Sequence, residues 1–117
     1  MPFDLLHHAK YISLTTFRKD GRGVATPVWF AESGGRLYVM TRGDSPKIKR
    51  LRRSPRVRVA PCTMSGRVTG PEVWATARVL PESDWPRARA LIRQKYWLAR
   101  LPFWSPKNVY LEIEPAD

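Results

Sequence analysis

Residues 43–53 read GDSPKIKRLRR and join an expected strand at residues 36–41 (RLYVMT) to a short basic helix. Ser45 is placed to cap that helix, and Pro46 suits its first turn. Backbone N–H groups at the start of a helix point outward and attract anions, and Lys47 begins a run of cations there. The junction therefore predicts a binding site for a phosphate group.

The rest of this helix has more positive charge than packing requires. Ile48 and Leu51 are three residues apart and are expected to face the core. The other positions are cationic, namely Lys47, Lys49, Arg50, Arg52 and Arg53. An ordinary solvated basic helix, packed through two apolar residues, has the same pattern. From this segment alone both interpretations stay open.

Six segments in all have the composition or the alternation of β-strands. They are residues 11–17 (YISLTTF), 24–30 (VATPVWF), 36–41, 56–61 (RVRVAP), 72–80 (EVWATARVL) and 109–114 (VYLEIE). Asp20 and Gly21 mark a hairpin turn between the first two. A second helix, capped by Ser83 or Asp84, is expected to run through Ala99. Six antiparallel strands with two interposed helices predict a mainly β domain over residues 1–117, built as a small barrel.

Two of these strands contain residues that restrict what packs beside them. Pro27 cannot donate a ladder hydrogen bond, so its strand is expected to lie at an edge, to bulge or to face a ligand there. In the segment 72–80, one face carries Val73, Ala75, Ala77 and Val79. Small alanines permit the close approach of another sheet, which together with the short chain predicts a homodimer.

The formal net charge of +11 over 117 residues predicts an anionic partner. Charge alone leaves that partner open among nucleic acid, lipid headgroups and a phosphorylated cofactor. A hydrophobic content of 43% argues against a disordered chain. Residues 1–10 lack the pattern of a secretory signal, and no segment approaches the roughly 20 apolar residues of a membrane span. A cytoplasmic location is therefore predicted.

Neither a catalytic pair nor a set of metal ligands stands out in the sequence. Cys62 is the only cysteine, so a disulfide within the chain is excluded. Without a partnering base, Cys62 is expected to be a packed thiol. His7 and His8 are adjacent and lie far upstream, which gives no recognisable ligand spacing. We predict no catalytic side chain and no metal site.

Several segments, taken in order, resemble the pyridoxamine-phosphate-oxidase-like split β-barrel superfamily. They are ISLTTFRKDGRGVATPVWF (residues 12–30), RLYVMT, GDSPKIKRLRR, PRVRVAPC (residues 55–62) and VWATARVL (residues 73–80). Within that superfamily the chain looks most like the flavin/deazaflavin oxidoreductases, especially the short branch that uses coenzyme F-420. The resemblance runs from Tyr11 to Pro115 and implies the FMN-binding split-barrel fold.

The resemblance also implies a homodimer with two cofactor sites at the subunit interface. By position it assigns the phosphate to Lys47, with Ser45 and Pro46 beside it and Lys49 or Arg50 as supporting cations. The strand along which the cofactor ring lies corresponds to Thr26, Pro27, Val28 and Trp29. The strand end that contacts the ring or the ribityl chain corresponds to Thr41 and Arg42. Pro61 and Cys62 fall where the partner subunit closes over the cofactor.

The chemistry that the resemblance implies is hydride transfer from reduced coenzyme F-420 to a conjugated molecule such as a quinone, enone or tetrapyrrole. A flavin or deazaflavin ring carries the reacting atom itself, which agrees with the lack of a catalytic pair. FMN is the alternative cofactor. Coenzyme F-420 adds an oligoglutamate tail, whose charges would meet Arg50, Arg53, Arg56 or Arg58.

Other classes of function stay open from the residues. A basic nucleic-acid-binding barrel fits the charge, although no RNP-like or helix-turn-helix pattern occurs, and a non-catalytic cofactor carrier is another alternative. Residues 96–104 (YWLARLPFW) are expected to cap the barrel or the dimer seam. A wall for a flat substrate and a contact with anionic membrane are the alternatives there. Tyr38 and Tyr96 are more often packing residues than proton donors.

Overall fold

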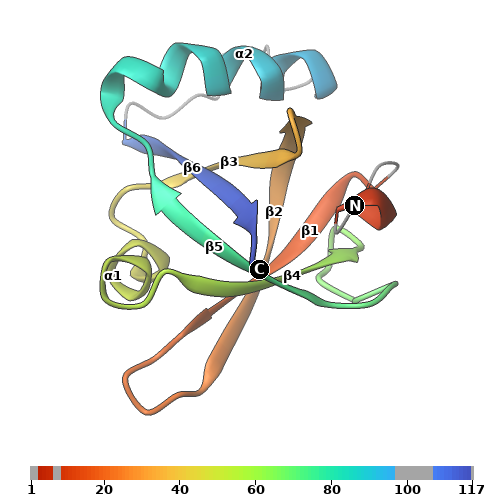
Figure 1. The fold of residues 1–117 in the computed structure, drawn as a ribbon, viewed down its shortest axis with the longest axis vertical. Helices are drawn as coiled ribbons and strands as arrows, with labels where there is room; N and C mark the ends of the chain where they lie inside the picture. The colour runs from red at the N-terminus through yellow and green to blue at the C-terminus, as the bar shows by residue number, and fades with distance from the viewer. Residues whose placement is uncertain (1–2, 7–8, 97–106, 117) are drawn as a thin grey trace.

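Six antiparallel strands close into a barrel, as the sequence predicts, and their order around it is β1-β2-β3-β6-β5-β4 (Figure 1). The computed structural model describes residues 3–6, 9–96 and 107–116. The strands are β1 (Tyr11–Phe17), β2 (Gly23–Ser33), β3 (Arg36–Arg42), β4 (Arg56–Cys62), β5 (Val73–Val79) and β6 (Asn108–Pro115). Closure pairs β1 with β4 along Tyr11↔Cys62 to Thr15↔Arg58, so the described sheet has no free first or last strand.

Two helices lie on different sides of this barrel (Figure 1). Helix α1 (Pro46–Arg53) packs against β1 and β5, and its buried residues are Ile48 and Leu51, as expected. Helix α2 (Trp85–Lys95) covers β2, β3 and β6 through Ala88 and Ile92. Short 3-10 turns precede β1 and α2, at η1 (Asp4–Leu6) and η2 (Glu82–Asp84). None of the described helices is both long and apolar enough to cross a membrane.

Helix α2 is shorter than its sequence predicts. It ends at Lys95, and Tyr96 is extended, with φ −118°. The Tyr96 ring stacks on Trp29 at 4.8 Å between centroids, and its hydroxyl accepts a hydrogen bond from the Phe30 N–H. These tertiary contacts hold Tyr96 against β2, away from the course of a continuing helix. Ala99, where the helix was expected to run, lies outside the described residues.

The alanine row on β5 lies inside the barrel. Ala75 and Ala77 are almost fully buried and pack in the same apolar cluster as Leu14 and Val59. The expectation that these alanines would meet another sheet at a dimer interface is therefore wrong. Side chains from opposite strands meet inside a small barrel, so some of them must be short. The alanines on β5 therefore make room for the barrel's own core.

The outer face beneath α2 holds a buried carboxylate with several partners. Glu112 on β6 accepts hydrogen bonds from Tyr38 Oη at 3.0 Å and from Arg78 Nε and Nη2 at 3.1 and 2.9 Å. Arg87 on α2 donates to the Tyr38 hydroxyl at 3.3 Å and lies 3.9 Å from the carboxylate. Burial opposes the ionisation of Glu112, but the bonds from Arg78 and Tyr38 outweigh it and hold its pKa below the usual value.

Candidate functional site

The barrel is split between β2 and β3. Their ladder runs only from Phe30↔Val39 to Ser33↔Arg36, whereas β2 continues to pair with β1 from Trp29 back to Gly23. The end of β3, from Met40 to Arg42, pairs only with β6. Figure 1 shows that β2 begins at the β1–β2 hairpin at the bottom of the view, whereas the chain after β3 leads to α1. The region between these two strand segments, which do not pair with each other, is called the opening below.

The expected ring and phosphate residues lie along this opening. Residues 26–29 are on the β2 edge, Thr41 and Arg42 end the β3 edge, and residues 45–47 begin α1 directly afterwards. Gly43 makes this tight passage possible, because a Cβ there would lie 3.1 Å from Val109 Cγ1 and 3.2 Å from the Lys107 carbonyl oxygen. Its N–H donates to that carbonyl at 2.8 Å, which fixes the turn against the chain before β6.

The cations of α1 that face β1 have no carboxylate partner within the described part of the chain. Lys47 is half-buried, and its pKa is lowered first by burial and then by repulsion from Arg50. Arg50 donates through Nε to Thr16 Oγ1 at 2.7 Å. Its own pKa is lowered by burial, by Arg18 and by Arg53. The lowered pKa values mean that the charged forms of Lys47 and Arg50 are disfavoured in this crowded position. A bound anion would therefore be favourable here.

Two hydroxyl groups among the expected cofactor-binding residues are buried without a hydrogen-bond partner among the described residues. They belong to Thr26 on β2 and to Ser45 at the start of α1. Ser45 stands at the N-cap position, as predicted, but its side chain makes no capping bond, and the Ile48 N–H bonds to the Ser45 carbonyl instead. An unpaired buried hydroxyl costs free energy unless a ligand satisfies it. Both groups therefore fit a polar ligand in the opening.

The remaining residues of the expected ring strand take different positions. Val28 is buried in the barrel core, so its backbone and not its side chain is at the β2 edge. Pro27 is exposed and pairs with Ser13 on one side only, since the β2–β3 ladder begins at Phe30. This agrees with the expected edge position. Trp29 has one ring face covered by Tyr96, with an angle of 9° between the ring planes.

Arg42 is engaged in an ion pair, whereas Lys49 is exposed. Arg42 is held by Asp44 through two bonds of 3.1 and 3.0 Å, in an exposed pair. A ligand that used Arg42 would have to share it with this carboxylate. Lys49 is exposed on α1, and Pro46 occupies the first turn as expected.

Pro61 and Cys62 do not line the opening of their own chain. Cys62 is level with Trp29, because both pair with Tyr11, but β1 lies between the two strands. Two strand spacings separate them by about 10 Å. Cys62 is buried, and burial raises the pKa of its thiol. Their expected role beside a cofactor therefore depends on a second subunit.

The sequence reasoning missed the part that β1 plays. Thr16 supports Arg50, and Arg18 in the following hairpin adds positive charge to the same cluster. Nothing local in YISLTTF signals these roles, because the partner helix lies more than 30 residues further on. Arg53 also reaches back, donating to the Phe17 carbonyl at 3.0 Å. Arg56 and Arg58 instead lie over the Trp74 ring on the outer face of β4.

The two tyrosines weighed as proton donors are both engaged in packing contacts. Tyr38 is buried between Glu112 and Arg87. The Tyr96 hydroxyl donates to the Lys10 carbonyl, and burial raises the pKa of Tyr96 to about 12. No group of three or more His, Cys, Asp or Glu residues among those described could hold a metal ion. Residues 97–104 of the expected aromatic cap lie outside the described residues.

A family model described as pyridoxamine 5'-phosphate oxidase matches residues 3–117. The chain belongs to this family. No curated protein matches it significantly. Solved structures confirm the fold: an F-420 reductase is 20% identical, with a TM-score of 0.68 and coverage of 98% of this chain and 93% of that one.

Two further solved structures have the same fold. A FAD-binding protein from Mesorhizobium loti is 20% identical, with a TM-score of 0.72 and coverage of 99% of this chain and 88% of the other. HutZ, the heme storage protein of Vibrio cholerae, is 12% identical, with a TM-score of 0.76 and coverage of 97% and 87%. The names of these three neighbours refer to F-420, FAD and heme, so proteins of this one fold are associated with different ligands.

Proposed function

We propose that the protein is an oxidoreductase that binds a phosphate-bearing flavin-type cofactor, coenzyme F-420 in preference to FMN, in the opening between β2 and β3. The observation that supports this most directly is the combination of unpaired cations and orphaned hydroxyls at that opening. The family match and the F-420 and FAD proteins of the same fold favour a cofactor of this type.

The residues present fit such a group. Lys47 and Arg50 would hold the phosphate, and Ser45 Oγ would donate a hydrogen bond beside them. Thr26 Oγ1 and the free backbone edge at residues 26–29 would bind the polar rim of the ring. Thr41 and Arg42 lie at the other side of the opening. The ring supplies hydride chemistry when bound, so the protein's tasks are binding, orientation and shelter.

A small conjugated substrate such as a quinone, an enone or a tetrapyrrole is the proposed hydride acceptor. We also propose a homodimer in which Pro61 and Cys62 approach the partner's cofactor, because one chain leaves them two strands away from its own opening. Sedimentation at micromolar concentration tests this part, and a monomer would overturn the role of Pro61 and Cys62.

Titration of the purified protein with F-420 and FMN, followed by cofactor fluorescence, tests the site. Lys47→Ala should weaken binding by about 1.5–3 kcal/mol, or roughly ten- to a hundredfold, because a charge-assisted contact is lost. Lys19→Ala removes an equal charge from the β1–β2 hairpin and serves as the matched control. Unchanged affinity in Lys47→Ala would remove the phosphate assignment.

The choice of cofactor is tested by salt and tail length. Affinity for F-420 should fall with added salt and rise with the number of glutamates, whereas FMN should bind more weakly. A random oligonucleotide tests the nucleic-acid alternative in the same buffer. Tight oligonucleotide binding without detectable F-420 binding would overturn the enzyme assignment. Reduced cofactor with a panel of quinones and enones then tests the hydride transfer itself.

A further inference from the structure

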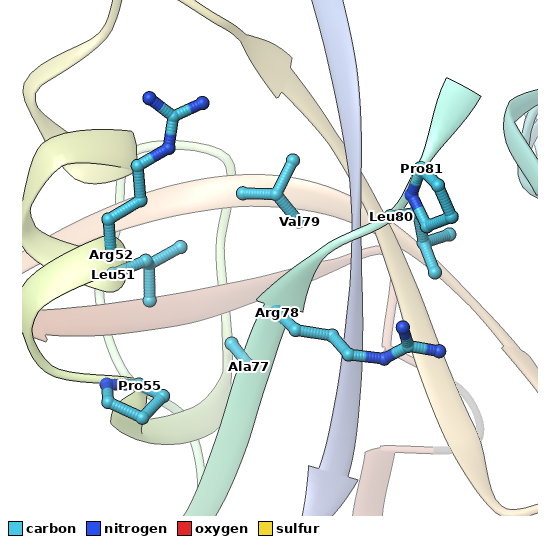
Figure 2. A pocket seen from close by; sticks show the side chains of 8 residues that line it. All are labelled: Leu51, Arg52, Pro55, Ala77, Arg78, Val79, Leu80 and Pro81. Atoms are coloured by element: carbon cyan, nitrogen blue, oxygen red, sulfur yellow. The ribbon is translucent and has the colours of Figure 1, made fainter.

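A cavity lies on the opposite flank of α1 from the proposed phosphate site. It has a volume of about 530 Å³ and is lined by Leu51, Arg52 and Pro55 on the α1 side and by residues 77–81 on the β5 side (Figure 2). Arg52 is five residues beyond Lys47, which places it about 140° further round the helix. Arg50, on the Lys47 flank, reaches β1, whereas this cavity faces β5. The two places are therefore separate.

The floor of this cavity is apolar. Leu51 and Ala77 are buried, and Val79 is half-buried beside them. Figure 2 shows Leu51 and Val79 turned toward each other across the hollow. The prolines at residues 55 and 81 border it without adding a side-chain donor or acceptor. Such a surface favours a hydrocarbon chain or ring over a strongly hydrated ligand.

Two arginines stand at the rim of the cavity, and they differ in whether a carboxylate pairs with them. Arg78 extends toward Leu80 and Pro81 and gives two of its hydrogen bonds to Glu112 (Figure 2). Arg52 is exposed, stands on the α1 side, and has no hydrogen bond or ion pair with the described residues. No carboxylate belongs to the lining. Arg52 therefore has a complete guanidinium fork available, a group that matches a carboxylate in two parallel bonds.

We propose that this cavity is a binding site for a small amphipathic carboxylate, with its apolar part on Leu51 and Val79 and its carboxylate at Arg52. The volume lies within the range of roughly 300–1,000 Å³ that is typical of small-molecule sites. This site is independent of the cofactor site and of the hydride-transfer proposal. It would give the fold a second ligand, on the other side of the helix that is proposed to hold the cofactor phosphate.

Titration of the isotope-labelled protein with octanoate, followed by amide NMR signals, tests the proposal. Saturable shifts should gather at residues 51–52 and 77–80. Affinity should rise severalfold from butyrate to hexanoate to octanoate, since each buried methylene contributes up to about a fourfold gain. Neutral octanol should bind more weakly than octanoate. Shifts that gather at residues 26–29 and 45–47, or that do not saturate, would overturn the site.

Two matched variants test the role of charge. Arg52→Gln should weaken octanoate binding at least fivefold and should leave octanol binding unchanged, because only the carboxylate contact is lost. Arg67→Gln removes an exposed arginine from the loop between β4 and β5 and should change neither affinity. Equal octanoate affinity in Arg52→Gln and the unsubstituted protein would contradict the assignment, and so would equal weakening in Arg67→Gln. Both substitutions are at exposed positions, and thermal unfolding checks that the fold is kept.

Discussion

The polar groups on the two sides of this barrel differ in whether they have hydrogen-bond or ion-pair partners. Beneath α2, the buried carboxylate of Glu112 is surrounded by Tyr38, Arg78 and Arg87. On α1 and at the unpaired part of β2, Lys47 has no acidic partner and the hydroxyls of Ser45 and Thr26 have no hydrogen-bond partner among the described residues. One side satisfies its polar groups internally. The other keeps charge and hydrogen-bonding capacity available.

This difference separates a structural network from the proposed ligand site. A satisfied buried network stabilises the packing of one element on another, here α2 on β3 and β6. Unsatisfied groups lower the stability of the free protein, and a bound ligand can recover that free energy. A map of surface charge alone would not distinguish the two sides, because arginines lie on both of them. Substitutions on the two sides should therefore have different effects on folding and on binding.

The largest expected effect is on the α2 side. Glu112→Ala should lower the free energy of unfolding by about 2–3 kcal/mol, because the buried Tyr38 hydroxyl loses its acceptor while Arg78 and Arg87 regain water. Glu114→Ala is the matched control, since its 2.8 Å pair with Arg36 is exposed and should contribute less than about 1 kcal/mol. Urea unfolding measures both. Equal losses of unfolding free energy in the two variants would show that Glu112 contributes no more than an exposed ion pair.

The same carboxylate predicts a dependence of stability on acid. Because the folded-state pKa of Glu112 lies below its ordinary value of 4.5, its contribution is complete above that pH. It is lost as pH falls through the folded-state pKa. Glu112→Gln should therefore flatten the decline in stability below pH 4.5. A decline as steep as that of the unsubstituted protein would assign the acid sensitivity to other carboxylates.

On the α1 side, two threonines of neighbouring strands should respond with opposite signs. Thr26→Val removes a buried hydroxyl that has no partner, so stability should rise by up to about 1 kcal/mol while cofactor affinity falls. Thr16→Val removes the acceptor of Arg50 and should cost about 1 kcal/mol of stability. Thermal unfolding with and without F-420 measures both. If Thr26→Val lowered the stability, the Thr26 hydroxyl would contribute to folding even in the absence of a ligand.

The smallest expected effect is at the end of α2. Lys95 Nζ lies 3.2 Å from the centre of the Phe30 ring, and burial lowers the pKa of Lys95 to about 8, partly opposed by Glu32. Because this pKa is below the ordinary 10.5, stability should rise as pH increases from about 8 toward 10.5.

Acylation of Lys95, mapped by mass spectrometry, should have its midpoint near pH 8, where the free amine forms. Thermal unfolding across the same pH range should show a smaller change in Lys95→Arg. An acylation midpoint above pH 10 would mean that attraction of the ammonium to the Phe30 ring outweighs desolvation.

Local patterns were sufficient for much of this fold. Alternation and turn residues predicted all six strands, and the spacing of Ile48 and Leu51 predicted the buried face of α1. These features depend on side-chain periodicity and on residues close in the chain. The same pattern predicted a small barrel, and the resemblance of GDSPKIKRLRR and its flanking segments to the split-barrel superfamily specified which barrel fold, which the family match and the structure confirm.

Contacts between distant segments decided the rest. The sequence placed Ala75 and Ala77 on one face of a strand, but only barrel closure determined that this face points inward. It placed Ser45 at a helix start, but only the packed structure left its hydroxyl without a partner. The pairing of Thr16 with Arg50 and of Arg78 with Glu112 joins residues 34 positions apart. The sequence by itself therefore determined the elements and their amphipathic faces, while the tertiary structure decided which polar groups are satisfied, because that depends on neighbours that only folding brings together.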